Sequence, residues 1–278
     1  MSGKQSHAAL ALAAALALGS CTGDTPGPLE IPTDPIDNPT TLNPKEQLQH
    51  SLPAYDEIRA RLQEIVADQN GGLGFHMWAV IVDRDGFVLD VLFSGDDRAS
   101  EWPGSRAIAA QKANTANAFS LDGFALSSAN LYAPTQPGGS LYGLQESNPV
   151  DPDVAYGGNP LLYGTENDPM TGRRIGGINV FGGGLALYSA EGVLLGGLGL
   201  SGDTSCTDHI IAWKLRHALN LDNVPAGPDP DSGTDNIIYK QAKLDGFEHP
   251  TCFDTPGRGD HIDIGNDLPT THPVGAAP

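Results

Sequence analysis

A glycine-rich segment that leads into a helix constrains the fold of this chain more than any other feature. Residues 196–209 read GGLGLSGDTSCTDH, and apolar residues at helical spacing continue to Leu219. Glycine lets a strand approach a helix or a ligand closely, and a strand that ends at a helix N-terminus places free backbone N–H groups there. The sequence therefore predicts a strand, a Ser-Gly-Asp-Thr turn and a helix, with a ligand site at the turn.

The composition indicates one compact core with long loops. The 278 residues include 35 Gly and 22 Pro, and 39% of the chain is hydrophobic. The formal net charge is −19. Because neutralisation of phosphates needs an excess of Lys and Arg, we exclude nucleic acid as a partner.

The first residues predict export. An unbroken run of 11 Ala and Leu residues, Ala8 to Leu18, follows Lys4. It is too short to span a bilayer and has the length of a signal-peptide core. The tetrad LGSC at 18–21 resembles a bacterial lipobox, which implies a signal peptide over residues 1–20 and lipidation of Cys21. We expect a lipid-anchored protein that faces the periplasm or the cell exterior; the alternative is an ordinary secretory signal with an incidental cysteine.

The regular segments predict one α+β domain over residues 51–222. Residues 21–50 are rich in Pro, Thr and Asp and predict a disordered tether. A helix of about 14 residues is expected from Ser51, with Ile58 and Leu62 on its apolar face. An apolar run at 75–82, a turn signature at 83–86 and an alternating segment at 87–93 predict one hairpin, and the glycine-rich segment 176–200 predicts a second. Further helices are expected over 105–120 and 208–219. This order favours an antiparallel β-sheet flanked by helices.

Two segments fall outside that pattern. Residues 133–174 lack periodicity and predict a long loop insertion that is not a core element, and residues 223–278 predict a mostly coil tail. Beyond Cys21 the chain has two cysteines, Cys206 and Cys252. In an exported protein such a pair favours a disulfide, here between the tail and the last helix; free thiols or a thiolate metal ligand are the alternatives.

Four motifs along the domain match a known pattern. These are AVIVDRDG at 79–86, the alanine- and lysine-containing segment 107–119, FGGGLAL at 181–187 and the glycine-rich segment 196–208. In this order they resemble the haem-degrading domain family of GlcG and HbpS-like proteins. The resemblance implies a compact domain that binds haem or a related tetrapyrrole and is often a homo-oligomer. Leu185 and Ala186 stand where the family usually has proline, and His209 where it usually has an acidic residue.

The resemblance directs attention to possible ligands of haem. Haem iron takes an axial donor, most often a neutral imidazole, and propionates bind basic side chains or N–H groups. His209 is the first candidate for the iron and His76 the second. The expected remainder of the site comprises Trp213, Ser201, Gly202 and Thr204 as pocket wall, and Arg98 and Lys112 for the propionates. The competing interpretations are a solvated His209, a core or edge His76, and ordinary ion pairs for the basic residues.

The functional hypothesis is a membrane-tethered, extracytoplasmic haem-binding protein. No acid, base or nucleophile falls into a recognisable catalytic pattern, so no catalytic residue is predicted and a non-catalytic role is favoured. Two alternatives remain. One is a structural lipoprotein that uses the same fold for oligomerisation, and the other is a haem-modifying enzyme.

Overall fold

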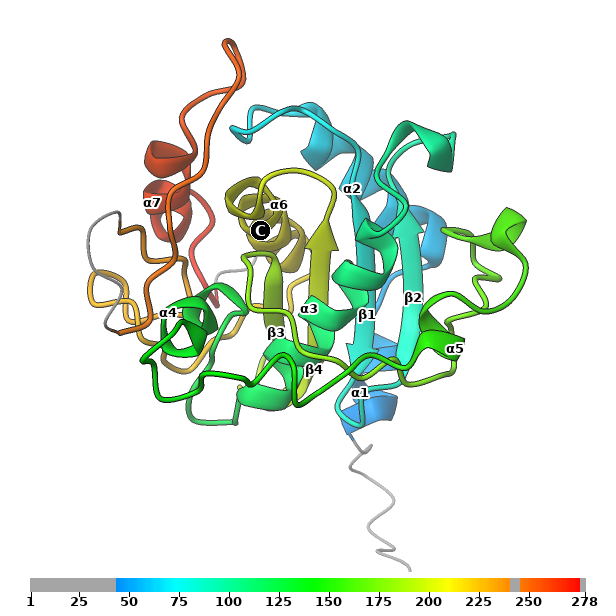
Figure 1. The fold of residues 1–278 in the computed structure, drawn as a ribbon, viewed down its shortest axis with the longest axis horizontal. Helices are drawn as coiled ribbons and strands as arrows, with labels where there is room; N and C mark the ends of the chain where they lie inside the picture. Colours follow the sequence, from blue (N-terminus) through cyan, green and yellow to red (C-terminus); the bar gives the residue numbers. More distant parts are fainter. Residues whose placement is uncertain (1–43, 241–245, 276–278) are drawn as a thin grey trace, which may run out of the picture. The chain divides into compact units, whose positions relative to one another are not determined.

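The computed structural model describes residues 44–240 and 246–275. The predicted signal peptide, the lipidation site Cys21 and most of the expected tether lie outside the described residues. Within them, a four-stranded antiparallel sheet is flanked by helices (Figure 1), which confirms the predicted α+β class. None of the helices in this part of the chain is both long and apolar enough to cross a membrane.

The sheet consists of the two predicted hairpins. Its strands are β1 (Trp78–Asp83), β2 (Val88–Phe93), β3 (Gly184–Tyr188) and β4 (Leu194–Ser201), in the order β2-β1-β4-β3. β1 pairs with both β2 and β4 and is buried along its whole length. Its side chains alternate between two cores, with Ala79 and Ile81 on one face and Trp78 and Val80 on the other. Residues 176–183, expected to begin the second hairpin, form no strand.

The helix α3 (Ser105–Phe119) covers one face of the sheet and lies in front of it in Figure 1. The glycines of β4 permit this close approach. A Cβ added at Gly197 or Gly199 would collide with a backbone carbonyl of α3, that of Ala113 or Ala109. The alanine-rich helix and the glycine-rich strand therefore fit each other backbone to backbone.

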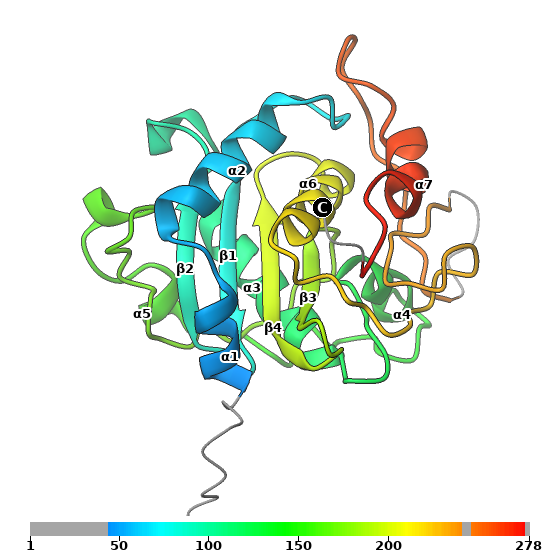
Figure 2. The same cartoon turned by 180° about the vertical axis from the view of Figure 1, so that it is seen from behind.

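Three helices cover the opposite face, as Figure 2 shows: α1 (Pro44–Ser51), α2 (Tyr55–Ala67) and α6 (Ser205–Ala218). Ile58 and Leu62 pack there as predicted. The predicted start at Ser51 is wrong, because that residue ends α1, and Pro53 prevents the helix from continuing into α2. Residues 44–50 of the expected tether are helical, and Leu48 is buried in the core.

The insertion contains no strand among the elements assigned in it. It holds α4 (Tyr132–Thr135), α5 (Pro152–Ala155) and short 3₁₀ turns. The expectation that it stays out of the core is wrong, since Val154 and Met170 join the core beneath α3. The insertion is also held by a buried ion pair between Arg106 and Asp168. The buried ion pair and the two apolar side chains together hold the insertion against the domain. None of these contacts gives rise to a periodic pattern in the sequence.

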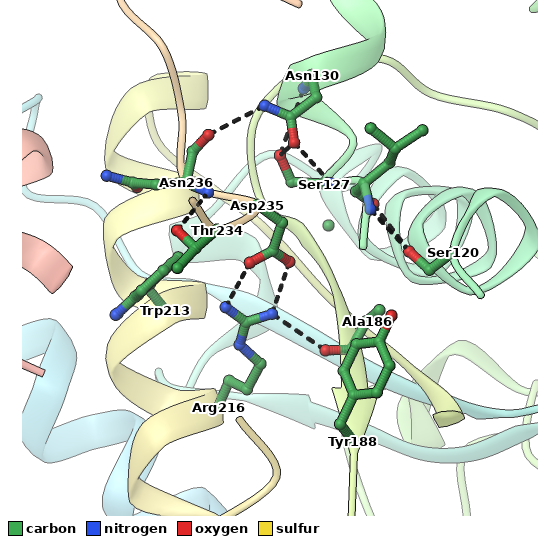
Figure 3. Close-up of polar contacts among 12 residues, drawn as sticks. Ser120, Ser127, Asn130, Ala186, Tyr188, Trp213, Arg216, Thr234, Asp235 and Asn236 are labelled. Atoms are coloured by element: carbon green, nitrogen blue, oxygen red, sulfur yellow. Dashed lines mark hydrogen bonds and ion pairs between the residues drawn. The ribbon is translucent and has the colours of Figure 1, made fainter. Parts of the chain in front are cut away.

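The C-terminal segment packs against α6. Cys206 and Cys252 form the predicted disulfide. Figure 3 shows a second anchor, in which Asp235 accepts two hydrogen bonds from the Arg216 guanidinium at 2.7 and 2.9 Å. The segment also contains α7 (His261–Thr271), where the sequence predicted mostly coil.

Candidate functional site

The predicted turn after β4 holds a neighbouring loop. The Asp203 carboxylate accepts backbone hydrogen bonds from Leu73 at 2.9 Å, Gly74 at 2.7 Å and Phe75 at 3.1 Å. Thr204 caps α6 by accepting the N–H of Thr207. The polar groups of the turn are thus engaged by the protein itself, and the residues they position are those of the loop before β1.

His76 ends that loop and is exposed. Its Nδ1 lies 3.3 Å from Ser94 Oγ, which also accepts the N–H of Met77 at 2.9 Å. When Nδ1–H donates to Ser94, Nε2 keeps its lone pair, and no described residue hydrogen-bonds to Nε2. The imidazole is therefore oriented at one nitrogen and available at the other.

His76 is not among the residues that line the nearest described pocket, which has a volume of about 470 Å³, but it contacts two residues that do. One is Phe93, a buried residue whose ring sits 5.8 Å from the imidazole, and the other is Gly95, where an added Cβ would come within 3.1 Å of His76 Cδ2. The rest of the lining is mixed in character. It includes the apolar or aromatic residues Leu161 and Tyr163, the cationic residues Arg59 and Arg98, and the acidic residues Asp96 and Glu166.

The two arginines of this pocket differ. Arg59 donates to the carbonyl of Phe93 at 2.9 Å and pairs with Asp96 at 3.2 Å. Arg98 is exposed and forms no ion pair with the described residues. Of the predicted propionate partners, Arg98 is therefore the one placed to meet an anionic ligand.

The structure separates His209 from any such pocket. Its side chain is fully buried, and Nε2 accepts the N–H of Ile237 at 3.1 Å. Burial, aided by the charge of Arg216, lowers the pKa of His209 to about 3. Trp213 is also buried and donates to the carbonyl of His272 at 2.9 Å. Neither side chain forms a pocket wall, and His209 would reach a haem iron only if the packing around it opened.

Lys112 is likewise held inside the protein. Its Nζ lies 2.6 Å from Asp208 Oδ2 and donates to the carbonyl of Leu200 at 3.1 Å. Burial lowers the pKa of Lys112 and raises that of Asp208, and the attraction within the pair opposes both changes. The pair joins α3, β4 and α6, so Lys112 is not free for a propionate. Ser201 and Gly202 are buried in the same junction.

Glu101 is a residue of this region that the sequence did not single out. It is buried, with Oε1 accepting the N–H of Trp102 at 2.7 Å and Oε2 lacking a partner among the described residues. Burial raises its pKa to about 7, and the charges of Asp208 and Asp203 add to the effect. It precedes Trp102, which is half exposed and meets Phe75 edge-on at 5.3 Å. Glu101 lies outside any periodic segment, so no local pattern announces its burial.

The comparisons with known proteins concern the domain just described. The family model of HbpS-like haem-degrading proteins matches residues 55–215. Among solved structures, the Klebsiella pneumoniae protein ORFY is 21% identical, with a TM-score of 0.40 and coverage of 59% of this chain and 86% of its own. The PduOC:heme complex is 26% identical, with a TM-score of 0.41 and coverage of 60% and 93%. No curated protein matches the chain. Because the family model spans more than half of the sequence, from α2 through most of α6, the chain belongs to the family of HbpS-like haem-degrading proteins.

Proposed function

We propose that this protein binds haem or a closely related tetrapyrrole in the pocket beside His76. The family assignment supports the class of ligand. The observation that carries the choice of site is the state of His76: the side chain is exposed, Nδ1 is held by Ser94 and Nε2 has no described partner. A second contact that orients a ligating histidine is the usual arrangement at metal centres.

The residues around this site suit the proposed ligand. His76 would coordinate the iron through Nε2, Leu161 and Tyr163 would contact the apolar macrocycle, and Arg98 would bind a propionate. When bound, haem supplies a redox-active iron whose potential depends on this axial ligand. The acidic residues of the pocket restrict where propionates can lie, because Asp96 and Glu166 repel them.

The proposed role is binding without chemical conversion. The titratable groups that line the pocket are arginines, tyrosines and carboxylates spread along a wide opening. None of these lining residues is a lysine, and none is a histidine, the side chain that most often serves as a general acid or base. The Arg59–Asp96 contact is an ion pair at the surface.

The cellular setting completes the proposal. The protein would be exported and tethered to a membrane through lipidated Cys21, with the domain facing the periplasm or the exterior. Self-association would use the exposed aromatic pair of Phe75 and Trp102, because paired aromatic side chains are enriched at interfaces. Light scattering of the wild type and of Trp102→Ser measures this association.

The test of the haem site is a hemin titration followed by the Soret band. We expect a shift that saturates at one hemin per chain, and at least a tenfold loss of affinity in His76→Ala. The matched control is His50→Ala, because His50 is an exposed histidine of α1 outside the pocket. An unshifted Soret band in the wild type would refute haem binding. Equal affinity of wild type and His76→Ala would refute the site.

A further inference from the structure

The loop that presents His76 is held from two sides. Asp203 binds its backbone on one side, as described above. On the other side, Gly71 donates to the carbonyl of Arg258 at 2.8 Å, and Gly72 donates to Asp254 Oδ1 at 2.6 Å. Thr255 returns a hydrogen bond to the carbonyl of Gly72 at 2.8 Å. Figure 1 shows the two segments beside each other at the end of the sheet where β4 ends.

Residues 252–258, which bind the second side of this loop, are joined to α6 by the disulfide. Cys206 is fully buried, whereas Cys252 is partly exposed. The Sγ of Cys252 also accepts the N–H of Cys206 at 3.2 Å, at the first turn of α6. A thiolate at this position is stabilised by the N–H group and by the positive end of the helix dipole. Cys252, the partly exposed cysteine of the pair, is therefore the one whose thiolate is stabilised by the N-terminus of α6.

A histidine and a carboxylate accompany the two sulfurs. A ring nitrogen of His261 lies within 4.8 Å of both Cys206 Sγ and Cys252 Sγ. The Nδ1 of His261 is 2.7 Å from Asp254 Oδ2, and its Nε2 accepts the N–H of Cys252 at 3.0 Å. These contacts place the proton on Nδ1 and engage the lone pair of Nε2 with the N–H of Cys252, so His261 can take up a thiol proton once that hydrogen bond opens. This Cys-His-Asp arrangement is one that activates thiols.

We propose that Cys206–Cys252 is a redox-active disulfide that reacts with an external dithiol, and that its reduction releases residues 252–258 and thereby loosens the loop of His76. The first thiol attacks Cys252 Sγ, the S–S bond breaks, and Cys206 Sγ leaves as a thiolate. The second thiol attacks the mixed disulfide and frees Cys252. The dithiol is oxidised to a disulfide and its two protons end on the two cysteine sulfurs, with His261 as the relay.

The reactivity of the disulfide is tested without haem. The folded full-length chain is treated with dithiothreitol, and free thiols are counted by maleimide mass tagging while circular dichroism follows the fold. We expect reduction in the folded state, about tenfold slower in His261→Gln and with an altered pH profile. His272→Gln is the control, because His272 lies at the far end of α7. Reduction only at the rate of global unfolding, or equal rates and pH profiles in wild type and His261→Gln, would overturn the proposal.

The coupling to His76 rests on the proposed haem site and is tested with two measurements. Hemin affinity is compared for the oxidised chain, the reduced chain freed of dithiol, and Cys206→Ser/Cys252→Ser. We expect about tenfold weaker binding in the last two; equal affinities would overturn the coupling. Hydrogen exchange at Gly71 and Gly72 gives a second readout that needs no haem. Faster exchange after reduction supports the coupling even if hemin fails to bind, and unchanged exchange refutes it.

Discussion

The buried ion pair of Arg216 and Asp235 gives the sharpest prediction for stability. Both side chains are fully buried, and two hydrogen bonds of 2.7 and 2.9 Å join them (Figure 3). Arg216 also donates to the carbonyl of Ala186 at 3.1 Å. Asp235→Ala leaves a guanidinium inside the protein without its counter-charge. Such a loss costs about 3–5 kcal/mol in the free energy of unfolding. For a domain of this size that lowers Tm on the order of 6–20 °C.

Removing both charges gives the opposite expectation. Arg216→Met/Asp235→Leu replaces the pair with apolar side chains of similar volume, so no buried charge is left uncompensated. We expect its free energy of unfolding within about 1 kcal/mol of the wild type, or above it. Urea unfolding followed by circular dichroism measures all three proteins. A double variant as unstable as Asp235→Ala, or a single variant within about 1 kcal/mol of the wild type, would refute this reasoning.

The same variants report on His209. Asp235 fixes residues 234–237, and Ile237 and Asn236 cover the His209 imidazole. In Asp235→Ala water gains access to His209, which raises its pKa from about 3, while the uncompensated charge of Arg216 opposes the rise; in the double variant that charge is absent and the pKa should lie higher. An NMR titration of His209 in Asp235→Ala separates this local opening from a global loss of structure.

Two further predictions concern Glu101, in the loop before α3, and Gly199, where β4 contacts α3. Burial raises the pKa of Glu101 to about 7 from 4.5, so the folded state retains its proton and the wild type loses stability as pH rises from 4.5 to 7. Glu101→Gln removes this loss. Between pH 5 and pH 7, the free energy of unfolding of the variant, measured with urea, should rise relative to that of the wild type by about 1 kcal/mol or more. If the difference in free energy between the two proteins is the same at both pH values, the assignment is contradicted. Gly199→Ala should cost about 3 kcal/mol in the same assay, because its Cβ would meet the backbone of α3, whereas Gly104→Ala, with open space around the added Cβ, should stay within about 0.5 kcal/mol. Equal effects of the two alanines would show that α3 yields to the added methyl.

The elements that the sequence predicted correctly carry their own periodic pattern. β1 is a continuous apolar run followed by a turn signature, and α3 and α6 have apolar or small residues at helical spacing, so packing and local propensity favour the same structure. α1 and α7 were missed because each buries few apolar side chains, Leu48 in the first case and Leu268 in the second. Their helical structure depends on contacts with distant parts of the chain, which a local pattern does not encode.

The environments of the two candidate histidines also depend on contacts with distant parts of the chain. A histidine in the first turn of a helix is usually solvated, and nothing near His209 in the sequence indicates otherwise. It is buried because residues 234–237 fold back over it, anchored by Asp235. His76 stays exposed because Asp203 and the segment 252–258 hold its loop away from the core. Both outcomes follow from pairings between residues at least 19 positions apart in the chain.

The glycine-rich segment at 196–209 thus organises the site without forming it. Three polar groups at the predicted ligand site have protein partners: Asp203 binds the loop before β1, Asp208 pairs with Lys112, and the N–H of Cys206 donates to Cys252 Sγ. These partners come from three segments distant in sequence, so the turn acts as the junction that fixes their relative positions. These carboxylates and this N–H group are therefore not free for a ligand, whereas the buried Nδ1 of His209 lacks a partner among the described residues. Of the two histidines proposed for the iron, His76 is the one that is exposed and whose Nε2 has no partner among the described residues, which is why our proposal places the ligand there.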